Sequence, residues 1–346
     1  MADVSIFSNP AFGTMNLSDS ITCVPNMYDR ITRMGLFSEK SIRTTHFSVE
    51  YREGNLNLIP AGVRGGPAHK NRTSKRSLRT FQVPHFSLED EVLADDIQNI
   101  RAWGSVSELQ GVQMYVNDRL AELAPKHQQT MEWMRMGALN GNILDADGST
   151  LLDLYGEFGI TRQSFNYDFA GAPNIEKTNS DIKRYMRKQA KGEPMSGIYV
   201  LASPGFMDNL LDDASVKEAY RYYQAISDQG AAKDPNREAD RDAFKHQGLI
   251  YHEYDGEVDY VAQDGTVTTY DFIPNGEAIA FPLGTRNIFR TYVAPADFME
   301  TVNTPGQMMY AKQEPLKFNR GIELHTQMNA IPFITRPELV VTLTSA

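Results

Sequence analysis

The chain has 346 residues, of which 41% are hydrophobic and 23% are charged, so it can bury the cores of two or three domains and has the composition of a globular protein. These values exclude a collagen-like or disordered chain, and no window approaches the roughly 18 apolar residues of a membrane-spanning helix. The net charge of −10 excludes a chain that as a whole seeks nucleic acid.

Residues 1 to about 27 predict an extended arm, because they include prolines and show neither helical nor strand periodicity. The first residues lack the basic and apolar regions of a signal peptide, so we expect no secretion by a signal peptide; a cytosolic site of folding fits the single cysteine. The single cysteine, Cys23, excludes an intrachain disulfide and is interpreted as a small apolar side chain. Residues 28–37 then predict a short helix that ends at Gly35.

A long two-stranded projection follows. Residues 41–59 alternate between apolar and polar side chains, which is typical of a strand. The glycine- and proline-rich run 60–67 predicts a loop tip, and a return strand passes through residues 78–83. A two-stranded ribbon is only marginally stable alone, so we expect it to lie on a neighbouring subunit.

The charge along this projection is unevenly placed. No acidic residue occurs between Gly54 and Leu88. The cations of this stretch, candidates for subunit contact, are Arg64, Lys70, Arg72, Lys75, Arg76 and Arg79. An acidic run follows at once and supplies candidate partners: Glu89, Asp90, Glu91, Asp95 and Asp96. Nucleic acid is the alternative partner of the cations, but no aromatic side chain is present at the tip for base stacking, which favours a protein partner.

The longest predicted helix covers residues 106–139. A capping box at Ser105–Glu108 opens it, and apolar residues recur at three- and four-residue intervals. Pro125 is expected to kink or restart the helix, because proline supplies no N–H group. Fully helical, this segment spans about 50 Å and forms a spine for the fold.

The rest of the chain predicts mixed helices and strands in an α+β fold. Residues 145–149 predict a turn, a capping box at Ser215–Glu218 predicts a further helix, and the polar stretch 227–247 predicts a surface loop. Helices are expected at 175–190 and from Ser203-Pro204 onward. The expected strands are 151–155, 158–169, 198–201, 249–254, 266–272, 289–293, 307–312, 321–328 and 339–343.

No motif for catalysis or for a cofactor is present. The glycines at 62–66 lack the Lys-Ser/Thr of a phosphate-binding loop. The turn at Asp145 is not a calcium loop, because its sixth position is Thr150 and its twelfth is Gly156. The seven histidines never pair at a zinc-ligand spacing. We therefore expect no enzyme, no cofactor and no metal; a cytosolic enzyme whose carboxylates the sequence does not pair stays open as an alternative.

Three stretches carry a resemblance to a known family. They are 64–67 with 81–85, 136–141 with the turn at 145–148, and 281–285 running into 289–292. These stretches and the order of the predicted elements resemble the Hong Kong 97-type (HK-97-like) capsid fold and the phage lambda-type major capsid protein family (protein E). The resemblance covers nearly the entire chain.

The resemblance implies a fold with an N-terminal arm, a long extended β-hairpin loop, a spine helix, and peripheral and axial domains. By position, the arm is 1–40, the extended loop 41–86, the peripheral domain with the spine helix 87–172 and 287–346, and the axial domain 173–286. Some members crosslink a lysine to an asparagine of a neighbour. Lys70 and Asn71 lie near the tip, but the lambda-like branch is not expected to form this bond.

The implied function is that of a major capsid protein of a bacteriophage. Such proteins assemble with themselves into hexamers and pentamers of an icosahedral head around double-stranded DNA, which they touch through non-specific contacts. The implied partners are a portal, a decoration protein and a scaffolding protein. Members with a fused scaffold carry a long helical segment before the arm, whereas here the ribbon begins near residue 41, so we expect either a separate scaffolding protein or a sequence that is already mature. The resemblance also implies that no membrane is involved and that the protein is located in the virion and, during assembly, in the host cytoplasm. An encapsulin-like compartment shell is the alternative with the same fold.

Overall fold

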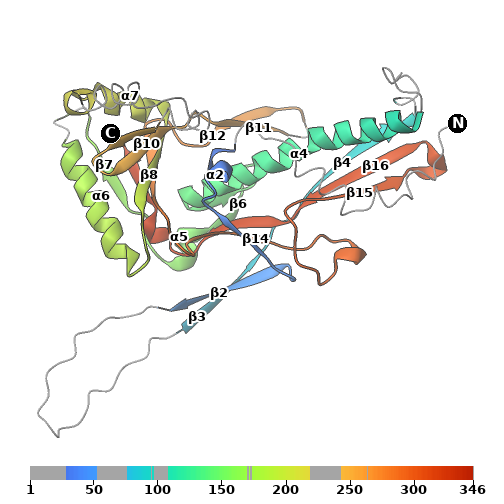
Figure 1. The fold of residues 1–346 in the computed structure, drawn as a ribbon, viewed down its shortest axis with the longest axis horizontal. Coiled ribbons are helices and arrows are strands. Elements are labelled where there is room, and N and C mark those ends of the chain that lie inside the picture. Colours follow the sequence, from blue (N-terminus) through green and yellow to red (C-terminus); the bar gives the residue numbers. More distant parts are fainter. Residues whose placement is uncertain are drawn as a thin grey trace, which may run out of the picture.

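The computed structural model describes residues 29–52, 76–94, 96, 108–169, 171, 174–218, 243–262 and 264–345. One long helix, α4 (Glu108–Asn140), runs along most of the molecule (Figure 1). The prediction of a spine helix is confirmed, but a restart at Pro125 is wrong, since the helix continues through this residue. Buried side chains on both sides of Pro125, including Leu120, Ala124 and Met131, hold the helix against the sheets below it, which compensates for the lost hydrogen bond.

A three-stranded antiparallel sheet covers the N-terminal half of α4. Its strands, in spatial order, are β15 (Tyr310–Pro315), β16 (Gly321–Met328) and β4 (Phe86–Leu93). Val116 and Leu120 of the helix pack against Ile322 and Leu324 of β16. The return strand was predicted to end at residue 83, and β4 was not predicted, because acidic residues occupy the centre of β4.

A second sheet lies under the C-terminal half of α4. It consists of β1 (Ser38–Ser41), β14 (Phe289–Val293) and β17 (Ala330–Ile334), with β1 parallel and β17 antiparallel to β14. The strand β17 was not predicted, although all five of its residues are buried. It follows β16 after one residue, Asn329, so no turn signal separates the two strands.

A short hairpin and a helix follow α4. The strands β5 (Asn142–Leu144) and β6 (Thr150–Asp153) enclose the predicted turn, in which Asp145 N donates to Ser149 O at 2.8 Å. The helix α5 (Leu154–Phe158) replaces part of a predicted strand. Asp153 explains this, because its side chain caps the helix by accepting a hydrogen bond from Gly156 N at 3.0 Å.

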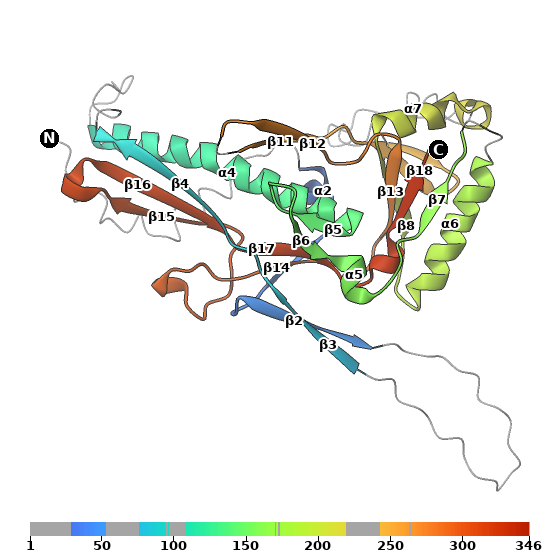
Figure 2. The ribbon, with the colours of Figure 1, turned by 180° about the vertical axis from the view of Figure 1, so that it is seen from behind.

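The third and largest sheet lies at the opposite end of the molecule from the β15–β16 hairpin (Figure 2). Its spatial order is β7 (Ser164–Asn166), β18 (Val341–Thr344), β13 (Glu277–Leu283), β8 (Gly197–Ala202), β10 (Leu249–Glu253) and β9 (Ala243–His246). Two helices pack on it, α6 (Ile175–Ala190) and α7 (Pro204–Asp212). Both were predicted: the bounds of α6 agree, and Ser203 caps α7, which begins with Pro204.

Two predictions near this sheet are wrong. The helix assigned to the Ser215–Glu218 capping box begins at residue 214, and Asp213 is its cap, since its carboxylate accepts hydrogen bonds from Ser215 N at 2.9 Å and Val216 N at 3.4 Å. Residues 243–246 of the predicted surface loop form β9, where Ala243 and Phe244 are buried. Residues 219–242 lie outside the described residues.

The smaller elements connect the sheets. The helix α2 (Arg30–Arg33) confirms the predicted short helix, and Gly35 follows it with a φ of 59°, a value that glycine adopts without strain. The strands β11 (Glu257–Val261) and β12 (Val267–Asp271) form a separate antiparallel hairpin, of which only β12 was predicted. The 3-10 turns are η4 (Met299–Thr301), η5 (Lys317–Asn319) and η6 (Pro337–Leu339).

Arg336, which is distant in the sequence, caps the C-terminal end of α6. Arg336 donates hydrogen bonds to the carbonyl oxygens of Ala190, at 2.6 Å, and Gln189, while its Nε lies 3.2 Å from Glu338. The last carbonyls of a helix have no intrahelical partner, and a cation there also complements the helix dipole. Arg336 therefore fixes α6 to the segment that leads into β18.

We predict that Arg336→Ala lowers the free energy of unfolding by about 1–2 kcal/mol, since water replaces only part of the lost charge-assisted bonding. Urea denaturation of the unassembled subunit measures this loss. The exposed Arg286 offers a control, and Arg286→Ala should change the unfolding free energy by less than about 0.5 kcal/mol. An equal effect of the two substitutions would contradict the role of Arg336.

Candidate subunit-contact surface

The predicted ribbon is present and leaves the body of the molecule (Figures 1 and 2). It consists of β2 (His46–Arg52) and β3 (Arg76–Gln82), which are antiparallel with Phe47 opposite Phe81. The base is anchored by aromatic packing: the ring of Phe47 stacks on Tyr292 at 3.9 Å, and Phe81 lies 5.0 Å from Phe333. The sequence thus predicted the ribbon correctly, and buried rings fix the place where it leaves the body.

The structure places two of the six predicted cations. Arg76 begins β3 and pairs with Arg52 in register. Arg79 is held by its own chain, because its Nη1 lies 3.3 Å from Glu157 Oε2 and its guanidinium lies over the ring of Phe158. The other four predicted cations, which belong to the tip, lie outside the described residues: Arg64, Lys70, Arg72 and Lys75.

Three acidic residues of the predicted run lie on β4. Glu89 and Glu91 are exposed and point to the same face, whereas Asp90 is half-buried on the other face. The carboxylate of Asp90 lies 3.8 Å from Arg119 Nε of α4. Asp96 accepts a hydrogen bond from Leu93 N at 3.2 Å, and Asp95 lies outside the described residues. Part of this acidic run therefore already has partners within the chain.

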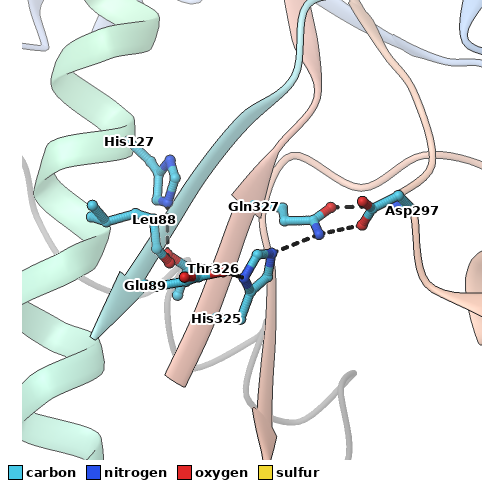
Figure 3. Close-up of polar contacts among 7 residues, drawn as sticks. All are labelled: Leu88, Glu89, His127, Asp297, His325, Thr326 and Gln327. Atoms are coloured by element: carbon cyan, nitrogen blue, oxygen red, sulfur yellow. Dashed lines mark hydrogen bonds and ion pairs between the residues drawn. The ribbon is translucent and has the colours of Figure 1, made fainter. Parts of the chain in front are cut away.

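Glu89 begins a row of polar side chains that crosses β4, β16 and the segment before η4 (Figure 3). Its Oε1 lies 3.0 Å from His325 Nδ1, and His325 Nε2 lies 2.8 Å from Gln327 Nε2. Gln327 in turn donates to Asp297. Since the amide N–H of Gln327 donates to Nε2, the proton of a neutral His325 is on Nδ1 and is donated to Glu89. The row stabilises the sheet but leaves Glu89 62% exposed.

A second histidine joins the spine helix to this sheet (Figure 3). His127 of α4 is buried, and its Nε2 lies 2.8 Å from Thr326 Oγ1. Thr326 donates to Leu88 O at 3.2 Å, so its oxygen accepts the Nε2 proton of His127. Burial lowers the pKa of His127 to about 4, assisted by the nearby charges of His325 and Lys126. His127 is therefore a neutral structural residue at pH 7.

Glu132 ties the arm to α4. The helix α2 has no side-chain cap from Asp29. Glu132, which is fully buried, supplies the cap instead: Oε1 accepts from Ile31 N at 2.6 Å, and Oε2 accepts from Thr32 N at 3.3 Å and Thr32 Oγ1 at 2.8 Å. The buried Arg135 donates to Thr32 Oγ1. Glu132 was not predicted as a cap, because its partners lie 100 or more positions away in the sequence.

No group of three or more His, Cys, Asp or Glu side chains with metal-binding geometry occurs among the described residues. In that same part of the chain, none of the helices has both the length and the apolar character needed to cross a membrane.

The ribbon, the spine helix and the flanking sheets together have the arrangement of the Hong Kong 97-type capsid fold, and solved structures share this fold. The putative capsid protein of an Escherichia coli CFT073 prophage has a TM-score of 0.55, with 12% identity over 94% of this chain and 95% of that chain. The mature capsid of bacteriophage PhiM1 has a TM-score of 0.51, with 13% identity over 93% of this chain and 87% of that chain. The predicted fold class is confirmed.

Sequence relatives give the family. Residues 13–345 match the family described as Phage major capsid protein E. The major capsid protein of Pseudomonas phage KPP10 is 30% identical over 95% of this chain and 96% of its own length. That of Salmonella phage Felix O1 is 25% identical, with 95% of each chain covered. The chain belongs to the phage major capsid protein E family.

Family membership confirms the predicted function. The chain is a phage capsid subunit, and hence a component of the virion. Its family and relatives are structural capsid proteins, not enzymes, so neither the compartment-shell nor the enzyme alternative is favoured.

Proposed function

We propose that copies of the chain form hexamers and pentamers of an icosahedral head that encloses double-stranded DNA. The observation that carries this proposal is the β2–β3 ribbon. It contains two strands only, and no third strand of the described residues pairs with it. Leu78 is 68% exposed on β3. Since a two-stranded ribbon is marginally stable by itself, a neighbouring copy is the natural support for it.

The subunit contact we propose joins the ribbon cations to the acidic surface of β4 on a neighbour. The cations proposed are Arg64, Lys70, Arg72, Lys75, Arg76 and Arg79; the acids are Glu89, Asp90, Glu91, Asp95 and Asp96. Support comes from the exposure of Glu89, Glu91 and Asp96. A single exposed ion pair contributes at most about 1 kcal/mol, but a closed symmetric shell repeats each contact many times.

We propose a division into an N-arm (1–40), an extended loop (41–86), a peripheral domain with the spine helix (87–172 and 287–346) and an axial domain (173–286). Two apolar clusters support it, one between α4 and the β15–β16–β4 sheet and one under α6 and α7. The largest cluster joins the two domains, since it contains both Met134 and Phe281. The sheet of the second cluster also includes β7 and β18, so the ends of the peripheral segments contribute strands to it.

The remaining partners follow from the resemblance alone. We propose a separate scaffolding protein, a portal, a decoration protein and non-specific contacts with packaged DNA, with assembly in the host cytoplasm. Co-purification from infected cells, before and after DNA packaging, tests each of them.

The experiment is electron microscopy with size-exclusion chromatography of the purified protein, with and without the scaffolding protein. Closed particles or capsomer rings are expected, and a stable monomer under every condition would overturn the proposal. We predict that Arg72→Glu with Arg76→Glu lowers the yield of shells by about ten-fold or more, because the loss at one contact is repeated throughout the closed shell. The control, Lys245→Glu with Arg286→Glu, reverses two exposed charges away from the ribbon and should leave the yield unchanged.

A further inference from the structure

The hairpin β11–β12 has an outward face with no partner in the described residues. Its three cross-strand pairs on this face are Glu257 with Asp271, Asp259 with Thr269, and Val261 with Val267. All six side chains are exposed, and the two valines are 62% and 58% exposed. The opposite face packs on the spine helix, where the ring of Tyr270 lies 5.4 Å from that of Trp133.

The hairpin carries negative charge only. From residue 255 to residue 271 there are five acidic residues and no lysine or arginine: Asp255, Glu257, Asp259, Asp264 and Asp271. Glu257 and Asp271 lie directly opposite each other, and like charges in that position destabilise an antiparallel pair. No ion pair joins either residue to a cation elsewhere in the described chain. A cation from outside would relieve this repulsion.

The helix α6 carries the complementary charge. Three cations spaced at seven and four residues form one exposed stripe along it, namely Lys177, Arg184 and Lys188, and the exposed C-cap residue Lys191 extends the stripe past the last turn. The only acidic side chain on this stripe, Asp181, is already paired with Arg184 at 2.9 Å. The stripe spans about 21 Å at a rise of about 1.5 Å per residue, enough to cover the hairpin face, whose five-residue strands are about 17 Å long.

One copy does not bring these two surfaces together. In both views α6 lies at the end of the molecule and the hairpin lies beside α4 (Figures 1 and 2). A contact between different surfaces of two identical copies is heterologous, and repetition of such a contact closes a ring when the rotation permits.

We infer that the outward face of β11–β12 binds the basic stripe of α6 on a second copy within the capsomer. The carboxylates of Glu257 and Asp271 pair with the stripe cations, while Val261 and Val267 pack against the methylene stems of the lysines. This inference rests on the proposed assembly into hexamers and pentamers, and it concerns a surface distinct from the ribbon.

The test is charge reversal on each side and then on both. Glu257→Lys with Asp271→Lys, and separately Lys177→Glu with Lys188→Glu, should each lower the yield of closed shells by about ten-fold or more, because the weakened contact recurs throughout the shell. The chain with all four substitutions restores the contact with its signs exchanged and should recover most of the yield. Asp208→Lys with Glu218→Lys is the control on other exposed residues and should leave the yield unchanged.

Each outcome is informative. The inferred contact is overturned, while the shell function stands, in either of two cases. One is that the variant with all four substitutions assembles no better than the poorer of the two double variants. The other is that either double variant assembles like the wild type. If the variant Lys177→Glu with Lys188→Glu forms normal shells that retain less DNA, the stripe binds packaged DNA and the inferred contact is likewise overturned. A wild type that forms no particles would instead overturn the proposed assembly. Circular dichroism of each variant separates assembly defects from unfolding.

Discussion

Glu132→Ala is expected to destabilise the unassembled subunit by about 3–5 kcal/mol, the range typical when one partner is removed from a buried charged network. Glu132 accepts hydrogen bonds from Ile31 and Thr32 with both carboxylate oxygens. Its removal leaves these donors unsatisfied and takes away a negative charge beside the buried Arg135. Burial raises the pKa of Glu132, but the donors at both oxygens favour its ionised form.

Urea denaturation measures the loss, and hydrogen exchange locates it. In Glu132→Ala the amides of residues 30–34 should lose protection first, because α2 then lacks its cap. Glu122 of the same helix is a matched control: its side chain is 65% exposed and pairs with Arg119 at 3.1 Å. Glu122→Ala should cost less than about 1 kcal/mol. Comparable losses in the two variants would show that Glu132 is not a special link between arm and spine.

Local patterns were sufficient to predict the elements whose signals lie within a few residues. The bounds of α6 follow from its apolar spacing, with Ile182 and Met186 on the buried face. The cap and the first proline of α7 are adjacent in sequence, at Ser203 and Pro204. The ribbon was equally local, because apolar and polar residues alternate in the sequence on both sides of the glycine-rich run 60–67.

The elements that sequence analysis missed depend on distant partners. The strand β4 contains Glu89, Asp90 and Glu91, and only its pairing with β16 makes it a strand. Glu132 caps α2, which lies 100 positions earlier, and Arg336 closes α6, which ends 146 positions earlier. No spacing rule connects such residues.

The subunit-contact surface could be predicted only in part, again because partners that are distant in the sequence decide which side chains are free. The acidic run was interpreted as a free surface because charge along a sequence does not show which carboxylates have partners in the fold. Asp90 and Glu89 lie beside Arg119 and His325 of their own chain. The hairpin β11–β12 shows the converse: its acids are spread over 17 residues, from 255 to 271, and antiparallel pairing gathers three of them on one face.

We expect the folded protein to lose stability in acid because of His127. Its pKa is about 4 in the folded protein, below the ordinary value of 6.5, because burial disfavours the charged ring. Between these two values the unfolded chain binds a proton that the folded chain does not. Stability is therefore complete above pH 6.5 and is lost as the pH falls towards 4, by about 3 kcal/mol in total at about 1.36 kcal/mol per pKa unit.

Protonation at Nδ1 would place a charge in the apolar layer between α4 and β16, while Nε2 keeps its hydrogen bond to Thr326. His127→Gln keeps a donor for Thr326 and does not titrate, so at pH 7 it should cost only about 1 kcal/mol. Unfolding free energies of both proteins from pH 7.5 to 4.5 give the test: the wild type should lose its advantage as the pH falls. The exposed His46 is the control, and His46→Gln should follow the wild-type curve. If the wild type and His127→Gln keep a constant separation over this range, His127 is not the acid-sensitive link between the spine helix and the peripheral sheet.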